Sequence, residues 1–173
     1  TTLLRGVSRS FYLSIRVLPA GLRTPIAAAY LLARATDTVA DTAHVAREER
    51  HRLLTTLAAA VDAQPLPAGS VEKLVATLAP QQHDAAERAL ILALPACLAA
   101  LEPLDPGDQA DIRSLMRTIT SGQLLDLERF SSVQTPVALA SDAELLDYTW
   151  RVAGCVGEFW TDLCVRHLGD FAD

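Results

Sequence analysis

The sequence predicts an all-α protein that folds as a single domain over residues 1–173, and three observations support this prediction. Alanine, leucine and arginine dominate the composition, and these residues are strong helix formers. Most of the nine prolines fall between periodic apolar segments, where they would end helices. Finally, no stretch alternates apolar and polar residues in the way that a half-buried strand requires.

In the first third of the chain we expect three helices. The first extends from about Gly6 to Val17 and ends before the next proline. The second spans about Arg23 to Thr42, with Pro25 in its first turn, where proline is tolerated. The third runs from about Ala46 to Asp62, and the Pro- and Gly-containing segment 63–69 that follows reads as a loop.

Four further helices are expected after this loop. The first two run from about Ser70 to Leu78 and from about Asp84 to Leu101, the second with a kink at Pro95. A long helix follows from about Asp108 to Phe130. The last runs from about Ser141 to Leu168, and its opening serine is followed three residues later by a glutamate, which is the pattern of a capping box.

Composition and charge exclude several classes of protein. Half of the residues are hydrophobic and 21% are charged, so the chain can form a core. The net charge of −6 argues against a nucleic-acid partner. The three cysteines are odd in number and lack a CxxC, which favours a reducing, cytoplasmic location. The most apolar stretch, Ala89 to Leu101, is too short to span a membrane.

The most informative segment of the chain is the apolar helix that carries Asp37 and Asp41. These carboxylates are four residues apart, so they lie one turn apart on the same helix face and repel each other. Together with Tyr30 and Arg34 they form one polar stripe, at spacings of i, i+4, i+7 and i+11. The stripe is either the solvated face of the helix, with Arg34 bridging Asp37, or a magnesium site made of hard carboxylate oxygens.

Several segments resemble the squalene and phytoene synthase family, the head-to-head prenyl-diphosphate condensing enzymes. The first is Ser8-Arg-Ser-Phe-Tyr-Leu-Ser14, followed by AAAYLLARATDTVADT over residues 27–42. Later in the chain, Ser121-Gly-Gln-Leu-Leu-Asp-Leu127 resembles the mid-chain helix of the family. The segment from Asp147 to Glu158 is similar to the family's Tyr…VAGxVG pattern. The amino-acid sequence of the first two segments is most similar to that of bacterial squalene synthases.

This resemblance implies roles for particular residues. Asp37 and Asp41 match the first aspartate-rich motif of the family, which binds Mg²⁺. Tyr148 matches a catalytic tyrosine implicated in carbocation or proton handling, and Arg9, Ser10 and Arg34 match positions that bind diphosphate. The remaining substrate-binding candidates are Phe11, Tyr30, Gln123, Asp126 and Gly154.

The residues themselves leave alternatives open at these positions. Without the resemblance, Arg9 is better interpreted as a plain surface arginine, whereas Tyr148 could equally be a structural tyrosine with a satisfied hydroxyl. Gln123 and Asp126 could form a polar contact between helices. Gly154 and Gly157, which are costly inside a helix, imply the close approach of either a substrate or a neighbouring helix.

The resemblance also implies the fold and its extent. The family folds as an all-α isoprenoid synthase, in which helices surround an apolar cavity between two aspartate-rich motifs. We find no second motif before Asp173, so we expect the chain to be an N-terminal fragment of the domain, incomplete at the C-terminus. We therefore expect the 173-residue chain alone to be inactive. An open apolar groove should lie along residues 23–42 and 141–168.

The leading functional hypothesis is a transferase that condenses two farnesyl diphosphates head to head into presqualene diphosphate and then squalene. Its cofactors would be Mg²⁺ and NADPH, and its apolar product suggests peripheral membrane contact. The alternative within the family is a phytoene synthase, which uses geranylgeranyl diphosphate without NADPH. A non-catalytic helical interaction module and a degenerate family member remain as further alternatives. The sequence does not indicate an oligomeric state.

Overall fold

The computed structural model describes residues 2–8, 11–130 and 138–169, and these residues form helices and turns without a β-strand. An all-α fold is therefore confirmed for this part of the chain. The α-helices are α1 (Thr2–Ser8), α2 (Phe11–Val17), α3 (Ala20–Asp41), α4 (Arg47–Val61), α5 (Ser70–Leu78), α6 (Ala85–Leu92), α7 (Leu94–Ala99), α8 (Pro106–Arg129), α9 (Asp142–Thr149) and α10 (Cys155–Leu168). A 3₁₀ turn (Ala79–Gln81) follows α5, and a π-helical turn (Trp150–Gly154) joins α9 to α10.

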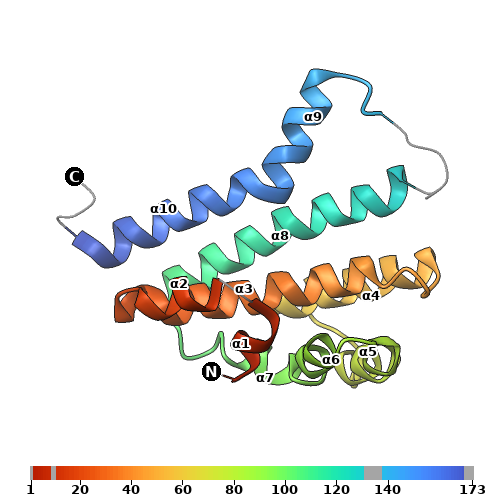
Figure 1. Cartoon of the computed structure of the whole chain (residues 1–173), viewed down its shortest axis with the longest axis horizontal. Helices are drawn as coiled ribbons and strands as arrows, with labels where there is room; N and C mark the ends of the chain where they lie inside the picture. The colour runs from red at the N-terminus through yellow and green to blue at the C-terminus, as the bar shows by residue number, and fades with distance from the viewer. Residues whose placement is uncertain (1, 9–10, 131–137, 170–173) are drawn as a thin grey trace.

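The helices are stacked in layers around α3, α4 and α8 (Figure 1). Helix α8 packs on both α3 and α4, and α10 packs on the other side of α8. The short helices α5, α6 and α7 cover the opposite side of α3 and α4. Leucine and isoleucine side chains fill the space between the layers and are fully buried, among them Leu32, Leu54, Leu57, Leu90 and Ile112. Their burial is the main contribution to the stability of the fold.

The start of the chain forms two helices where the sequence predicts one. Helix α1 packs on α6, and a Cβ at Gly6 would lie 3.4 Å from the Cβ of Ala86. Helix α2 packs on α3, with the ring of Phe11 stacked on that of Tyr30 at 5.2 Å between centroids. The two segments bury their apolar faces against different partners, which one straight helix through residues 6–17 would not reach.

The remaining helix predictions are largely confirmed. Helix α3 begins at Ala20, three residues before the expected start, so Pro25 lies inside the helix and not in its first turn. The expected kink near Pro95 is a break between α6 and α7, with the proline at the start of α7, where its missing N–H is harmless. Ser141 caps α9, because its hydroxyl accepts a hydrogen bond from the Glu144 N–H.

The last predicted helix is divided by the π-helical turn, and this turn explains one glycine. A Cβ at Gly154 would lie 2.9 Å from the Trp150 ring of the same turn. The glycine therefore makes room for a side chain of its own turn and not for a neighbouring helix. A Cβ at Gly157 would meet nothing within 4 Å. The expected close approach of a helix is found at Gly122 instead, where a Cβ would lie 3.0 Å from that of Arg151.

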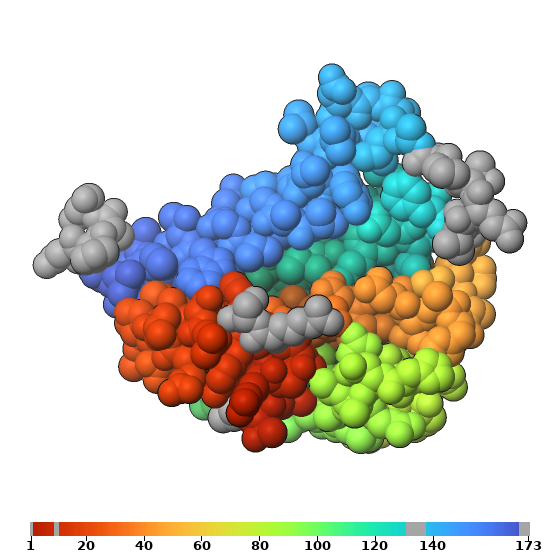
Figure 2. All heavy atoms as spheres, viewed as in Figure 1, coloured from red at the N-terminus to blue at the C-terminus, as the bar shows by residue number. Residues whose placement is uncertain are grey.

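The two segments that were expected to expose apolar surface differ. Helix α9 has no buried residue and projects from the body of the molecule (Figure 2). Along residues 141–168 the exposed large apolar side chains are Leu145, Leu146, Trp150, Val152 and Val165. Along residues 23–42 most apolar side chains are buried, but Ile26, Ala29, Tyr30 and Ala33 line an apolar pocket together with residues of α10, so the expected groove is present over part of both segments. Within the described residues no helix has the length and hydropathy needed to cross a membrane.

Candidate active site

A polar pocket of about 360 Å³ lies among α3, α4 and α8, and we call it the acid pocket. Three carboxylates line it: Asp37 and Asp41 from α3, and Asp126 from α8. Gln123 also comes from α8, and two arginines, Arg47 and Arg50, come from α4. The apolar part of the wall consists of Ala40, Ile119, Leu127, Phe130 and Val152.

Asp37 is held in place from across the pocket by Gln123. The Nε2 of Gln123 donates a hydrogen bond of 2.7 Å to Oδ1 of Asp37. Burial raises the pKa of Asp37, while the hydrogen bond from Gln123 and the charge of Arg34 partly offset this rise. The carboxylate of Asp41, one turn away, adds to the rise. This hydrogen bond links α3 to α8 in the lining of the acid pocket.

Asp126 faces the same pocket and is paired with Tyr148. Burial raises the pKa of Asp126, and the nearby charge of Asp41 raises it further. The charge of Arg129 and a hydrogen bond with Tyr148 lower this pKa and partly offset the rise. The pKa of Tyr148 is also raised, first by burial and then by the charge of Asp126 and the hydrogen bond to it. Tyr148 therefore stays protonated at neutral pH and donates to Asp126. Oδ1 of Asp126 is buried and has no hydrogen-bond partner.

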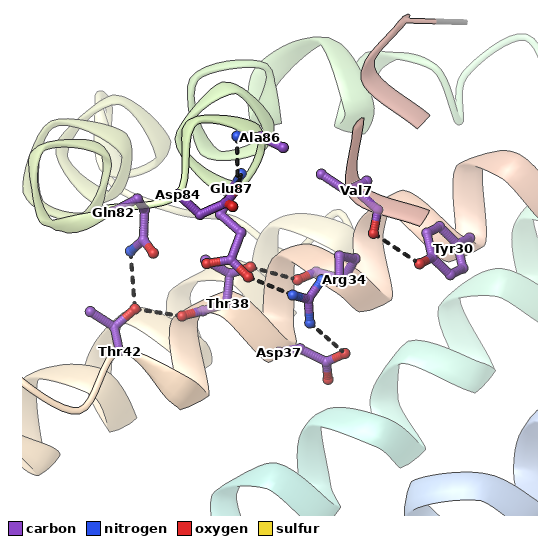
Figure 3. A network of polar contacts seen from close by, with 10 residues as sticks. All are labelled: Val7, Tyr30, Arg34, Asp37, Thr38, Thr42, Gln82, Asp84, Ala86 and Glu87. Atoms are coloured by element: carbon purple, nitrogen blue, oxygen red, sulfur yellow. Dashed lines mark hydrogen bonds and ion pairs between the residues drawn. The ribbon is translucent and has the colours of Figure 1, made fainter. Parts of the chain in front are cut away.

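The stripe of four polar residues on α3 is divided among three surroundings. Only Asp37 and Asp41 line the acid pocket. Figure 3 shows the guanidinium of Arg34 between two carboxylates: its Nη2 donates to Oε1 of Glu87 on α6 at 2.5 Å, and its Nη1 lies 3.9 Å from Oδ2 of Asp37. The Tyr30 hydroxyl donates to the carbonyl of Val7 at 3.3 Å. A magnesium site formed by this stripe would place all four side chains in one cavity, and the structure does not do so.

A second, apolar cavity of about 230 Å³ lies next to the acid pocket, among α2, α3, α8 and α10. Four aromatic residues line it, and three of their rings are in contact: Phe11 stacks on Tyr30 and meets Trp160 edge-on, with 6.5 Å between the ring centroids of Phe11 and Trp160. The other lining residues are aliphatic or aromatic: Ile26, Ala29, Ala33, Leu115, Ile119, Val156 and Phe159. This cavity places Phe11 and Tyr30, two of the predicted substrate-binding residues, in the same site.

Ile119 lines both the acid pocket and the apolar cavity, so the two sites adjoin there. On both α3 and α8, the residues nearer the N-terminus line the apolar cavity, and those nearer the C-terminus line the acid pocket. Ala29 and Leu115 line the apolar cavity, whereas Asp37 and Gln123 line the acid pocket further along each helix. A ligand with an anionic group and a hydrocarbon chain would match this order.

Four other predicted residues remain to be placed. Tyr148 reaches it through Asp126, whereas Gly154 lies in the π-helical turn and does not line the acid pocket. Arg9 and Ser10 lie outside the described residues. Sequence reasoning missed Arg47 and Arg50, because an Arg-Glu-Glu-Arg run at a helix start is typical of a solvated helix end. It also missed Ile119 and Trp160, whose apolar side chains carry no signal that separates a cavity from the core.

The residues of the acid pocket fit Mg²⁺ in one particular way. Among the described residues no three histidine, cysteine or acidic side chains are grouped so that they could hold a metal ion by themselves. Mg²⁺, however, usually takes one or two protein carboxylates and completes its shell with water and substrate phosphates. The unpartnered Oδ1 of Asp126 and the carboxylates of Asp37 and Asp41 are donors of this kind. The pocket therefore suits Mg²⁺ that is shared with a bound phosphate.

An all-α fold with an acid pocket adjoining an apolar cavity is the architecture of an isoprenoid synthase. Residues 4–171 match the protein family described as squalene/phytoene synthase, so the chain belongs to this family. Enzymes of the family are prenyltransferases that join prenyl groups head to head. The all-α isoprenoid-synthase fold predicted from the sequence is consistent with this match. A search of curated proteins gave no significant match.

Proposed function

We propose that this protein is a squalene-forming transferase that condenses two farnesyl diphosphates into presqualene diphosphate, which is then reduced to squalene with NADPH. The observation that carries the proposal is the junction at Ile119, where a pocket lined by three carboxylates adjoins a cavity lined by aromatic and aliphatic side chains. Farnesyl diphosphate has the same two parts, an anionic head and a hydrocarbon tail.

The carboxylates of the acid pocket would hold Mg²⁺. Bound Mg²⁺ would neutralise the charge that develops on the diphosphate as it leaves the allylic carbon. Asp37 and Asp41 present their oxygens from successive turns of α3, and Asp126 faces them from α8. Gln123 orients Asp37 by its hydrogen bond, and Tyr148 does the same for Asp126. Asp37 and Asp41 are thus the proposed metal ligands, with Gln123 and Tyr148 as positioning residues.

The apolar cavity would receive the hydrocarbon chain and the allylic cation that is left behind. The rings of Phe11, Tyr30 and Trp160 lie along its wall, and the electron-rich faces of aromatic rings stabilise cations. The remaining lining is also apolar, so it would help to exclude water and protect a cation from hydrolysis. Arg34 does not line this cavity, and its Nη1 lies 3.9 Å from Oδ2 of Asp37.

The choice between the two family substrates rests on the similarity of residues 8–14 and 27–42 to bacterial squalene synthases, which use farnesyl diphosphate. This similarity ranks squalene above phytoene as the proposed product. We further propose a cytoplasmic protein with peripheral membrane contact, supported by the exposed Leu145 and Leu146 on α9.

The proposal is tested by binding of unreactive thiodiphosphates carrying farnesyl or geranylgeranyl chains, measured by calorimetry in the presence of Mg²⁺. We expect the farnesyl compound to bind more tightly. The reverse order would support a phytoene synthase. If neither compound bound, both enzyme assignments would be contradicted, and a helical interaction module or a degenerate family member would be favoured.

A further inference from the structure

Helix α4 contributes two basic side chains to the lining of the acid pocket. Arg47 and Arg50 both line the pocket from the first turn of this helix. Nη1 of Arg50 donates a hydrogen bond of 2.6 Å to the carbonyl of Ala40, the residue that precedes Asp41. Arg50 therefore anchors the end of α3 on α4 while its side chain remains part of the pocket wall.

Arg50 differs from two neighbouring arginines in its ion pairing. Arg34 pairs with Glu87 at 2.5 Å, and Arg47 pairs with Glu48 at 3.2 Å. Arg50, in contrast, forms no ion pair with an acidic side chain in the part of the chain that the structure describes, although three carboxylates line the same pocket. Its Nε is buried and lacks a hydrogen-bond partner. A buried donor without an acceptor is unfavourable, so the guanidinium has hydrogen-bonding capacity that its contact with Ala40 does not use.

We propose that Arg50 binds the diphosphate group of the substrate directly. This inference rests on the proposed function and adds a binding residue to the same site. The diphosphate would be held by the Arg50 guanidinium together with Mg²⁺ bound to the carboxylates of Asp37, Asp41 and Asp126. An arginine presents several N–H groups in a fixed fork, which suits the oxygens of a phosphate.

A purely structural role is the competing explanation, and the chain contains a matched control for it. Arg113 on α8 donates from Nε to the carbonyl of Val61 at 3.2 Å, so it holds the end of α4 as Arg50 holds the end of α3. Arg113 lines a different pocket, between α4, α5 and α7, and not the acid pocket. Loss of either arginine removes one backbone anchor, but only loss of Arg50 removes a cation from the acid pocket.

The experiment titrates inorganic diphosphate with Mg²⁺ into the wild type and into Arg50→Met, Arg50→Lys and Arg113→Met, with thermal melts of each protein. We expect Arg50→Met to weaken diphosphate binding by at least about tenfold, since charged hydrogen bonds are among the strongest. Arg50→Lys, which keeps the charge but loses the fork, should weaken it severalfold. Arg113→Met should bind as the wild type does and lose a similar amount of thermal stability.

Each outcome decides the inference. Wild-type affinity in Arg50→Met would overturn it, and so would an equal loss of affinity in Arg113→Met. If Arg50→Met does not fold, unchanged binding by Arg50→Lys would overturn the inference, and severalfold weaker binding would support it. Absence of Mg²⁺-dependent diphosphate binding in the wild type would overturn the proposed function as well. If the wild type and Arg50→Met bind diphosphate equally well and Asp37→Asn does not bind it, this inference is overturned and the proposed function is not.

Discussion

The acid pocket and the apolar cavity are built from the same helices but differ in what their residues do. Both are lined by α3 and α8, and Ile119 belongs to each. In the acid pocket, polar side chains are fixed by hydrogen bonds across the helix interface, such as that of Gln123 with Asp37. In the apolar cavity, aromatic rings pack against one another and enclose space. One pair of helices can thus support two chemistries when polarity changes along its length.

The largest expected effect comes from removing a carboxylate of the acid pocket. Asp37→Asn keeps the shape of the side chain but removes a charged oxygen ligand, so Mg²⁺-dependent binding of diphosphate should fall by roughly a hundredfold or more. Stability should hold or rise by about 0.3 kcal/mol, because the repulsion between Asp37 and Asp41 is relieved. Calorimetry and a thermal melt check the two halves of this prediction. Unchanged affinity would remove the metal-binding role of Asp37.

The second prediction concerns the length of the apolar cavity. Trp160→Ala should enlarge the cavity and shift the preference between farnesyl and geranylgeranyl chains towards the longer chain by roughly tenfold. It should also cost about 2 kcal/mol of stability, because the indole packs against Phe11. Competition binding with the two thiodiphosphates measures the preference. Trp150→Ala is the control, because this tryptophan does not line the apolar cavity; the same shift in both variants would contradict the role of Trp160.

A smaller effect is expected where Tyr148 meets the acid pocket. Tyr148→Phe removes the donor that faces Asp126, so Mg²⁺ affinity should fall by about threefold and stability by about 1 kcal/mol. Tyr30→Phe removes a hydrogen bond to the Val7 carbonyl and not one to a carboxylate. It should lower stability without changing Mg²⁺ affinity. Titration of Mg²⁺ into both variants separates these outcomes, and identical affinities would show that Tyr148 is only structural.

The smallest expected effect is on the pH dependence of stability. Burial raises the pKa of Asp37 in the folded protein, so folding favours its protonated form. The stability that this group contributes is therefore fully present below the pKa of an unfolded aspartate, about 4, and is lost as the pH rises through the raised value. Urea unfolding of wild type and Asp37→Asn across this range should show a flatter profile for the variant. Parallel profiles would contradict the raised pKa.

The sequence predicts best those features of the fold that depend on residues close together along the chain. Helix periodicity and capping signals act over one or two turns, so they predicted most helices well, including the capped start of α9. The same spacing placed Asp37 and Asp41 together in one pocket. Those signals did not reveal that the first helix is divided, because the division depends on two partners, α6 and α3, that are distant in the sequence.

The site residues show the same limit. Tyr30 and Arg34 share the helix stripe with Asp37, yet their long side chains turn towards Val7 and Glu87, which only the folded structure brings near. Arg50 belongs to the acid pocket because α4 folds back along α3, a relation that its charged local sequence does not encode. The resemblance to a known family supplied Gln123 and Asp126, which spacing alone could not assign.

The magnesium requirement of prenyl-diphosphate binding is the decisive measurement for the two-part site. Unreactive farnesyl thiodiphosphate is titrated into the wild type with and without Mg²⁺, and in competition with inorganic diphosphate. If the head binds in the acid pocket through Mg²⁺ and the tail in the apolar cavity, binding will require Mg²⁺, will be displaced by diphosphate, and will be tighter than that of diphosphate alone. Equal binding without Mg²⁺, or no displacement by diphosphate, would contradict this assignment.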